Sequence, residues 1–280
     1  MTSVDYRQFK NKAFKVLITV LAFLCTLPLV FIIGYIVKKG FAAINWSFFT
    51  DLPAAVGEPG GGIAHALIGS LFIVLLSTAL AVPFGIFGGV YLAESPPSKL
   101  THIIRTGVEV LQGIPSIVIG IIAYLWLVKP MQTFSAFSGS VALAIMMLPL
   151  IVRSTEESLK LIPPTYKEAA LSLGVPYYKT LLKVILPAAF SGILTGLMMS
   201  IARVAGETAP LLFTAFGNAF LNLDMFKPMQ SLPLVIFNYA ASPYEAWHAI
   251  AWGASLVLMA WILLLNLIAR LATRKWKIQF

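Results

Sequence analysis

Apolar residues in this chain are gathered into long runs that shorter polar segments separate. Six runs approach or exceed the roughly 20 residues that a helix needs to cross a bilayer. Nearly all of their length lacks a charged face, whereas a helix in a soluble core keeps one side polar for water. The pattern therefore predicts an all-α, polytopic membrane protein with six transmembrane helices. The predicted spans cover residues 16–37, 66–92, 108–128, 136–152, 188–214 and 249–269.

The composition supports the same class of protein. Hydrophobic residues make up 59% of the 280 residues and charged residues only 11%, with a mean hydropathy of +0.89. A soluble domain, by comparison, has about 25% charged residues. The single cysteine, Cys25, excludes an intrachain disulfide, and the separate positions of His65, His102 and His248 argue against a metal site. No nucleophile or acidic pair has a setting typical of catalysis, so we do not expect an enzyme.

The basic residues are distributed unevenly between the predicted loops. The chain has 20 Lys and Arg against 11 Asp and Glu, which gives a net charge of +9. Fifteen of the basic residues lie in the two tails and in the loops at 93–106 and 153–187, and only four lie in the other three loops. Basic loops face the cytoplasm, so both termini are predicted to be cytoplasmic. The surplus charge then reflects contact with anionic membrane lipid, and nucleic-acid binding is not expected.

The predicted cytoplasmic loop at residues 153–187 has a helical pattern of its own. Thr165 stands three residues before Glu168, as in a capping box, and Gly174 supplies a C-terminal stop. These signals predict a short helix over residues 166–173 with a small, smooth surface. Such a helix either lies on lipid headgroups or fits a groove in a partner protein.

Proline interrupts several of the predicted helices. Pro176 and Pro187 bracket a second short helix, residues 177–186, which leads into the fifth span. Inside a span, proline either accompanies close helix packing or breaks the helix where it lines a path, and packing is the expected role at any single position. The prolines concerned are Pro28, Pro83, Pro115, Pro149 and Pro210.

The segment from Glu168 to Pro187 resembles a motif of the permease subunits of bacterial binding-protein-dependent ABC importers. Its residues stand at the spacing of that motif, with Val184 in place of the motif's isoleucine. In that family the first helix of the motif is the coupling helix, which docks into the nucleotide-binding subunit. The resemblance implies this ATPase-coupling role for Glu168, Ala169, Ala170, Gly174, Leu186 and Pro187.

Three further stretches narrow the resemblance to one type of permease within this family. Residues 113–116, 148–157 and 203–212 resemble the PstA-type permeases of high-affinity phosphate importers, a likeness that runs from about residue 60 to the C-terminus. The resemblance implies a MetI-like fold in the bacterial inner membrane. We therefore expect two parts, an N-terminal tail, first span and outer loop at 1–60 and a permease core at 61–280.

The same resemblance implies a function and a set of partners. The chain is expected to translocate inorganic phosphate by alternating access, beside a second, PstC-type permease and a dimeric ABC ATPase. A periplasmic or extracellular phosphate-binding protein would deliver phosphate to the outer loops, of which residues 215–247 form the longest. Because no Walker A sequence occurs in the chain, we expect ATP and Mg²⁺ on the separate ATPase and no cofactor in this chain.

Other functions stay open at this point. A PstC-type partner subunit, or a molybdate or sulfate permease, has the same fold and the same coupling helix. An ion-coupled secondary phosphate carrier is a different class of protein and needs no ATPase. Copurification with an ATPase separates the carrier from the importers.

Arg203 and Glu207 place two ionisable groups inside the fifth predicted span. An arginine there costs roughly 2.5–3.5 kcal/mol on an insertion scale, so its presence requires an explanation. The two residues belong to a predicted helical face that is small, polar or charged. This face is expected to line a wet path, although an ion pair that neutralises itself inside the bundle would give the same pattern. Its members are Gly196, Ser200, Arg203, Glu207, Pro210 and Thr214.

The chemistry of phosphate favours a substrate path over a self-neutralising ion pair. A guanidinium binds two phosphate oxygens at once, and Arg203 would supply it. Glu207 is hypothesised to accept the remaining phosphate proton or to temper the arginine, so that the anion is released. A fully deprotonated sulfate would meet only repulsion from Glu207. The predicted substrate path consists of Arg203, Glu207, Ser200, Thr208 and Thr214.

Overall fold

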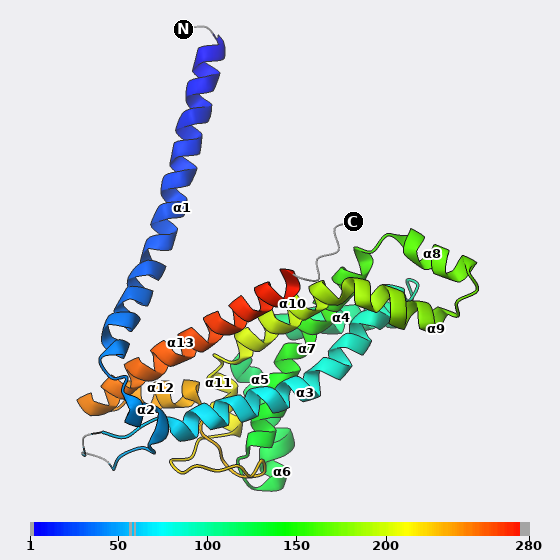
Figure 1. The fold of residues 1–280 in the computed structure, drawn as a ribbon. Coiled ribbons are helices and arrows are strands. Elements are labelled where there is room, and N and C mark those ends of the chain that lie inside the picture. The colour runs from blue at the N-terminus through cyan, green and yellow to red at the C-terminus, as the bar shows by residue number, and fades with distance from the viewer. Residues whose placement is uncertain (1–2, 56–57, 59, 275–280) are drawn as a thin grey trace.

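The computed structural model describes residues 3–55, 58 and 60–274, and in this part of the chain the regular structure is helical apart from one bridge between Phe216 and Met229 (Figure 1). Two π-helical turns, Tyr124–Val128 and Leu181–Ile185, join α5 to α6 and α9 to α10. The prediction of an all-α protein is confirmed. The helices are α1 (Ser3–Phe41), α2 (Trp46–Thr50), α3 (Ala64–Glu94), α4 (Lys99–Gly113), α5 (Ser116–Ala123), α6 (Lys129–Met131), α7 (Ala136–Lys160), α8 (Pro164–Ser172), α9 (Tyr177–Thr180), α10 (Leu186–Val204), α11 (Ala209–Thr214), α12 (Leu232–Ala240) and α13 (Glu245–Arg274).

Five helical segments among the described residues are long and apolar enough to cross a membrane, namely α1, α3, α7, Tyr177–Val204 and α13. The third predicted span, 108–128, is wrong as a single helix, because α4 and the helix that starts at Ser116 meet at 105°. Pro115 stands at this bend and holds the residue before it, Ile114, in extended backbone (φ −71°, ψ 130°). The bent pair brings the number of crossings to six if it is counted as one.

The fifth predicted span, 188–214, is also wrong as one continuous helix. The helix ends at Val204, four residues leave the helical path, and α11 begins at Ala209. Pro210 explains the break, since proline has no N–H to donate and its ring clashes with the carbonyl four residues earlier. The continuous polar face expected over this span is therefore divided between two helices.

Other prolines lie inside unbroken helices. Pro28, Pro83 and Pro149 fall within α1, α3 and α7. The glycines that follow Pro83 let α3 approach α7 closely: a Cβ added at Gly89 would lie 2.4 Å from the Cβ of Thr155. Packing is thus the role of this segment of α3, while Pro115 and Pro210 mark breaks.

The predicted outer loop at 215–247 contains an additional helix, α12. It packs against α13 and α3 and contributes Leu232, Val235 and Tyr239 to a buried apolar cluster. The backbone N–H of Leu232 donates to Ser70 Oγ of α3 at 2.7 Å. Hydropathy did not reveal α12 because its nine residues are too few for a span.

The predicted helix at 166–173 is confirmed as α8, and Gly174 ends it with a left-handed backbone (φ +73°). The predicted capping box is wrong, because Pro163 is the N-cap and no side chain caps the helix. The second predicted helix, 177–186, does not end at Pro187 but continues through a π-helical turn into α10. In the π turn, the Leu186 N–H donates to the Leu181 carbonyl. The chain then enters α10 with Pro187 in the first turn, a position where proline is well tolerated.

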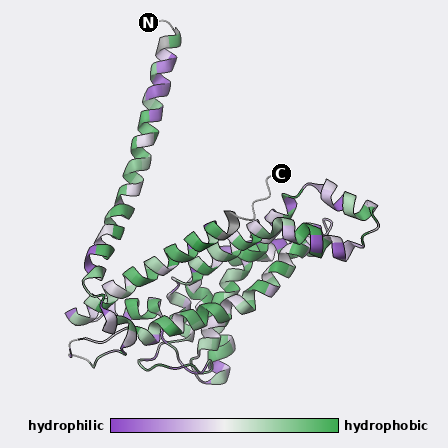
Figure 2. Cartoon of the chain, in the orientation of Figure 1, coloured by the Kyte–Doolittle hydropathy of each residue, from purple (hydrophilic) through white to green (hydrophobic). Residues whose placement is uncertain are grey.

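Helix ends that are far apart in sequence meet at two ends of the bundle. We call the region formed by the C-terminal ends of α3 and α7 with α8 and α9 the α8 end, and the region around α12 the α12 end (Figure 1). Apolar residues dominate α3, α10 and α13 between these regions, and hydrophilic residues gather on α8 and α9 (Figure 2).

Helix α1 stands apart from the other helices over most of its length (Figure 1). It contacts the N-terminal part of α13, where a Cβ at Gly40 would lie 2.6 Å from the Trp252 carbonyl oxygen and Tyr35 packs edge-on against Trp252. None of the most apolar stretch of α1 is buried in this chain. That surface is left for lipid or for another subunit.

Candidate substrate path and coupling surface

The break between α10 and α11 places the two predicted charged residues next to each other. Arg203 lies in the last turn of α10, and Glu207 lies within the break. Arg203 Nε stands 3.9 Å from Glu207 Oε1, which is beyond hydrogen-bond distance. The side chains are 49% and 20% exposed, and the guanidinium makes no hydrogen bond to the other described residues. The guanidinium donors are therefore not used by other residues in the described part of the chain.

The surroundings of the break are firmly packed. Val204 and Ala205 are buried beside it, and Pro210 of α11 lies against Gly120 of α5, where an added Cβ would be 2.7 Å from the proline Cα. Ile114, at the α4–α5 bend, packs against the same apolar cluster as Val204. The two interrupted helices thus meet.

Ser200 lies one turn before Arg203 but is directed into the protein. Its side chain is 1% exposed, and its hydroxyl has no hydrogen-bond partner among the described residues. One turn earlier, a Cβ at Gly196 would lie 2.0 Å from Ser154 Oγ of α7. The predicted polar face is therefore split: Gly196 packs against α7, Ser200 is buried, and Arg203 points to the surface.

The two predicted threonines have different environments. Thr208 is half-buried next to Glu207 and does not cap α11 with its side chain. Thr214 is fully buried and donates its hydroxyl to the Pro210 carbonyl at 2.7 Å. Thr208 directly follows Glu207 in the break, whereas Thr214 is packed near Gly139 of α7.

The predicted coupling residues fall on two elements. Helix α8 has no buried residue, Glu168 and Ala169 are exposed, and Ala170 is half-buried. Leu173, at the end of α8, is 83% exposed. Leu186 and Pro187 instead begin α10, where Leu186 packs against an apolar cluster that includes Leu159 and Ile185 and Pro187 is exposed. The first half of the motif, on α8, is thus mostly exposed. The second half, at the start of α10, connects α8 and α9 to the bundle.

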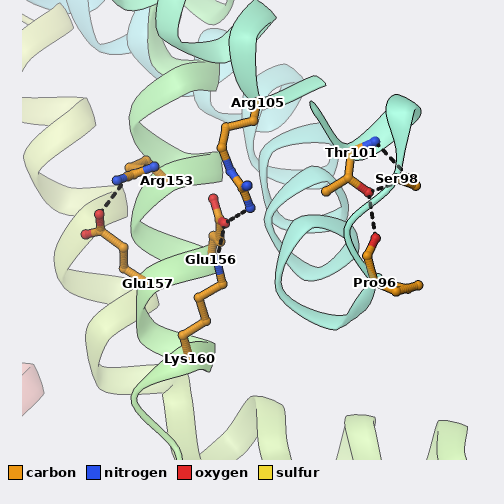
Figure 3. A network of polar contacts seen from close by, with 8 residues as sticks. All are labelled: Pro96, Ser98, Thr101, Arg105, Arg153, Glu156, Glu157 and Lys160. Atoms are coloured by element: carbon orange, nitrogen blue, oxygen red, sulfur yellow. Dashed lines mark hydrogen bonds and ion pairs between the residues drawn. The ribbon is translucent and has the colours of Figure 1, made fainter. Parts of the chain in front are cut away.

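Sequence reasoning missed a charged network at the α8 end (Figure 3). Glu156 of α7 is 2% exposed, and its Oε1 accepts from Arg105 of α4 at 2.7 Å and from Lys160 at 2.5 Å. Nearby, Arg153 and Glu157 form an exposed pair within α7 at 2.6 Å. The spacing of Glu156 and Lys160 is visible in the sequence, but the contact with Arg105 joins residues 51 positions apart.

No metal centre is evident in the described ranges, because no group of three or more His, Cys, Asp or Glu side chains gathers there. His65 is buried in α3 with both ring nitrogens unpaired among the described residues. A single histidine without further ligands does not form a metal site.

Comparisons with known proteins agree with this architecture. Residues 85–278 match the family model described as binding-protein-dependent transport system inner membrane component. The chain is 38% identical over 273 residues to the phosphate transport system permease protein PstA of Yersinia pestis, covering 97% of this chain and 92% of that protein. It is 40% identical over 271 residues to PstA of Pasteurella multocida, covering 96% of each.

Solved structures resemble the fold at lower sequence identity. An inward-facing MetNI methionine ABC transporter superposes with a TM-score of 0.66 at 18% identity, covering 77% of this chain and 96% of that one. An amino acid ABC transporter with histidines gives a TM-score of 0.58 at 20% identity, covering 76% and 92%. At these identities the likeness establishes the fold, which is MetI-like.

Proposed function

Because this chain belongs to the family of binding-protein-dependent transport system inner membrane components, as an inner-membrane permease of a phosphate importer, we propose that Arg203 and Glu207 line the path of phosphate. The observation that carries this assignment is the 3.9 Å separation of the pair at an interrupted helix. A self-neutralising ion pair would close to hydrogen-bond distance, about 2.7–2.9 Å. Here the guanidinium remains open to a second anion.

Phosphate matches the groups at the break. Two of its four oxygens fit the parallel donors of the Arg203 guanidinium, and near neutral pH phosphate still carries at least one proton. Glu207 accepts that proton, or weakens the attraction of Arg203 enough for the anion to leave. Thr208 adds a hydroxyl beside the pair. Ser200 supports the end of α10 from the buried side, and Thr214 supports α11 against α7.

Alternating access requires the path to open to one side at a time. The α4–α5 bend and the α10–α11 break are packed against each other through Gly120 and Pro210. We assign the change of access to a concerted movement of these two breaks, since an interrupted helix changes direction at lower cost than a continuous one. The continuous helices α3 and α7 serve as the wall against which they move.

We further propose that α8 is the coupling helix and that the α8 end faces the cytoplasm. Glu168, Ala169 and Ala170 would enter a cleft of the ATPase, which hydrolyses ATP with Mg²⁺, while Gly174, Leu186 and Pro187 shape the connection to α10. Both chain termini would then be cytoplasmic. The full importer would contain a PstC-type second permease, a dimeric ABC ATPase and a phosphate-binding protein outside.

The N-terminal part, residues 1–60, would act separately from the permease core at 61–280. Its main element, α1, leaves its apolar surface uncovered in this chain and joins the remainder mainly through α13. A long apolar helix of this kind is stable in a bilayer when lipid or a neighbouring subunit covers it.

The test of the proposed path is uptake by a Glu207→Gln variant in proteoliposomes that hold the whole importer. Because the amide keeps the size and removes the charge, phosphate transport should fall and the exclusion of sulfate should weaken. The variant should still copurify with the ATPase. Unchanged phosphate transport together with unchanged sulfate exclusion would contradict the role given to Glu207.

A further inference from the structure

Helix α8 is held to the bundle by polar contacts rather than by apolar burial. None of its residues is buried, and its main packing contacts are with the short elements that follow it, α9 and the π-helical turn. Lys167 of α8, however, extends its ammonium group to Glu94 Oε2 at 2.5 Å. Glu94 is the last residue of α3, 73 positions earlier in the chain.

The same carboxylate oxygen also receives a second donor. The Tyr177 hydroxyl, at the start of α9, donates to Glu94 Oε2. Lys167 Nζ lies 4.8 Å from the centre of the Tyr177 ring, so the cation and the aromatic face also contact each other. One oxygen atom of Glu94 therefore joins both arms of the hairpin that α8 and α9 form.

This contact differs from an ordinary surface ion pair. Glu94 is 17% exposed and Lys167 is 35% exposed, whereas Arg153 and Glu157 of α7 are 46% and 60% exposed. Exposed pairs contribute little because water screens them. A shielded carboxylate with two donors on one oxygen makes stronger, charge-assisted hydrogen bonds.

Glu94 is also fixed at its own end. The last turns of α3 contribute Val90 and Ala93 to an apolar cluster with Leu159 of α7 and Ile185 of the π turn. Gly89, directly before Val90 in α3, lies too close to α7 to carry a side chain. A force on α8 that passes through Glu94 is therefore delivered to the wall that α3 and α7 form together.

We propose that Glu94 is a positioning residue for energy coupling, which clamps the coupling helix α8 to α3 through Lys167 and Tyr177. The proposal rests on the coupling role assigned to α8 above. With the clamp in place, movement of α8 moves the α3–α7 wall. Without it, the hairpin bends at its base, and ATP hydrolysis continues with less phosphate moved.

The experiment measures phosphate imported per ATP hydrolysed, in proteoliposomes that hold the full importer. Glu94→Gln should lower this ratio by about 10-fold, the factor supplied by one hydrogen bond to a charged group. The melting temperature of the complex and the amount of copurified ATPase should stay at the wild-type level. The exchanged pair, Glu94→Lys with Lys167→Glu, should restore most of the ratio, because the opposite charges meet again.

Glu157→Gln is the matched control, since it removes the same charge from an exposed pair on α7, and its ratio should equal that of the wild type. An unchanged ratio in Glu94→Gln, or no recovery in the exchanged pair, would overturn the clamp. If Glu94→Gln does not assemble, Tyr177→Phe removes a single hydroxyl and should lower the ratio by a smaller factor, and an unchanged ratio there would overturn it as well.

A further variant separates this proposal from the role of α8 itself. Ala169→Trp places a large side chain on the exposed surface of α8 and should prevent copurification of the ATPase. If this variant still binds the ATPase and transports normally, the coupling role of α8 is wrong. If it loses the ATPase while Glu94→Gln keeps a normal ratio, only the clamp is wrong.

Discussion

Charge is held in two different ways at two places in this molecule. At the α10–α11 break, Arg203 and Glu207 stand 3.9 Å apart, and the guanidinium has no further partner among the described residues. At the α8 end, Glu156 is buried and accepts from Arg105 at 2.7 Å and from Lys160 at 2.5 Å. The first pair is loose and lies where a helix is interrupted. The second is tight and lies on a continuous helix.

We propose that this difference separates a pair that binds the substrate from a network that stabilises the fold. A carboxylate that two cations hold at hydrogen-bond distance uses those donors within the protein and ties α4 to α7. A guanidinium that stops short of its carboxylate leaves its donors for a ligand. Since an arginine inside a span costs roughly 2.5–3.5 kcal/mol to insert, a loose pair there indicates a function that offsets the cost.

The largest effect is expected from exchanging the loose pair, Arg203→Glu with Glu207→Arg. If the pair only neutralised itself, the exchange would preserve both the attraction and the transport. We expect phosphate uptake to fall by about 100-fold, because two hydrogen bonds to the anion are lost from their position. Uptake in proteoliposomes is the measurement, and near-normal transport would assign the pair to structure.

Gly89→Ala tests the wall that carries the tight network. The new methyl group would meet the Thr155 Cβ at 2.4 Å and the Val152 carbonyl oxygen at 2.7 Å. Overpacking of this kind typically costs about 1–3 kcal/mol, so thermal unfolding in detergent should begin at a lower temperature. Gly107→Ala is the control, because nothing lies within 4 Å of its added Cβ. Equal stability of the two variants would contradict the packing described for α3 and α7.

Glu156→Gln tests whether the tight network of Glu156, Arg105 and Lys160 stabilises the fold. The amide keeps the shape but loses the charge that attracts Arg105 and Lys160. The free energy of unfolding should fall by about 1–2 kcal/mol, since hydrogen bonds to a charged group are replaced by weaker ones whose cations are partly exposed. Phosphate uptake per folded complex should remain within a factor of about two. A larger loss of uptake than of stability would place this network in the path as well.

The smallest effect is expected at the exposed pair on α7. Arg153→Gln removes one partner of Glu157, and both side chains are well exposed. Stability should change by less than about 0.5 kcal/mol, the usual contribution of an exposed i,i+4 pair. A change as large as that of Glu156→Gln would show that exposure does not distinguish the two contacts.

Periodicity and charge were sufficient to predict the membrane class, most of the spans and the position of α8. They failed where local geometry overrides hydropathy. Residues 108–128 and 188–214 are apolar enough to cross as straight helices, yet Pro115 and Pro210 divide them. Proline alone did not reveal this, because Pro83 and Pro149 lie within unbroken helices of similar composition.

The candidate site was predicted only in part for a related reason. Arg203 and Glu207 could be found because a charge inside an apolar run is visible in the sequence. The side on which each neighbour lies was not visible: Ser200 and Thr214 are both buried in this chain, and their place in the path stays a prediction. Contacts such as Glu94 with Lys167 join residues 73 positions apart, and no local pattern reports them.

The most direct test of the proposed phosphate path compares Arg203→Gln with Arg105→Gln in the same reconstituted importer. Both variants remove one guanidinium, one from the loose pair and one from the tight network. We predict that Arg203→Gln assembles with normal thermal stability and loses ATP-dependent phosphate uptake, while Arg105→Gln loses stability and keeps its uptake per folded complex. Wild-type uptake by Arg203→Gln would contradict the role of Arg203 in the phosphate path, although the family of the protein would stand.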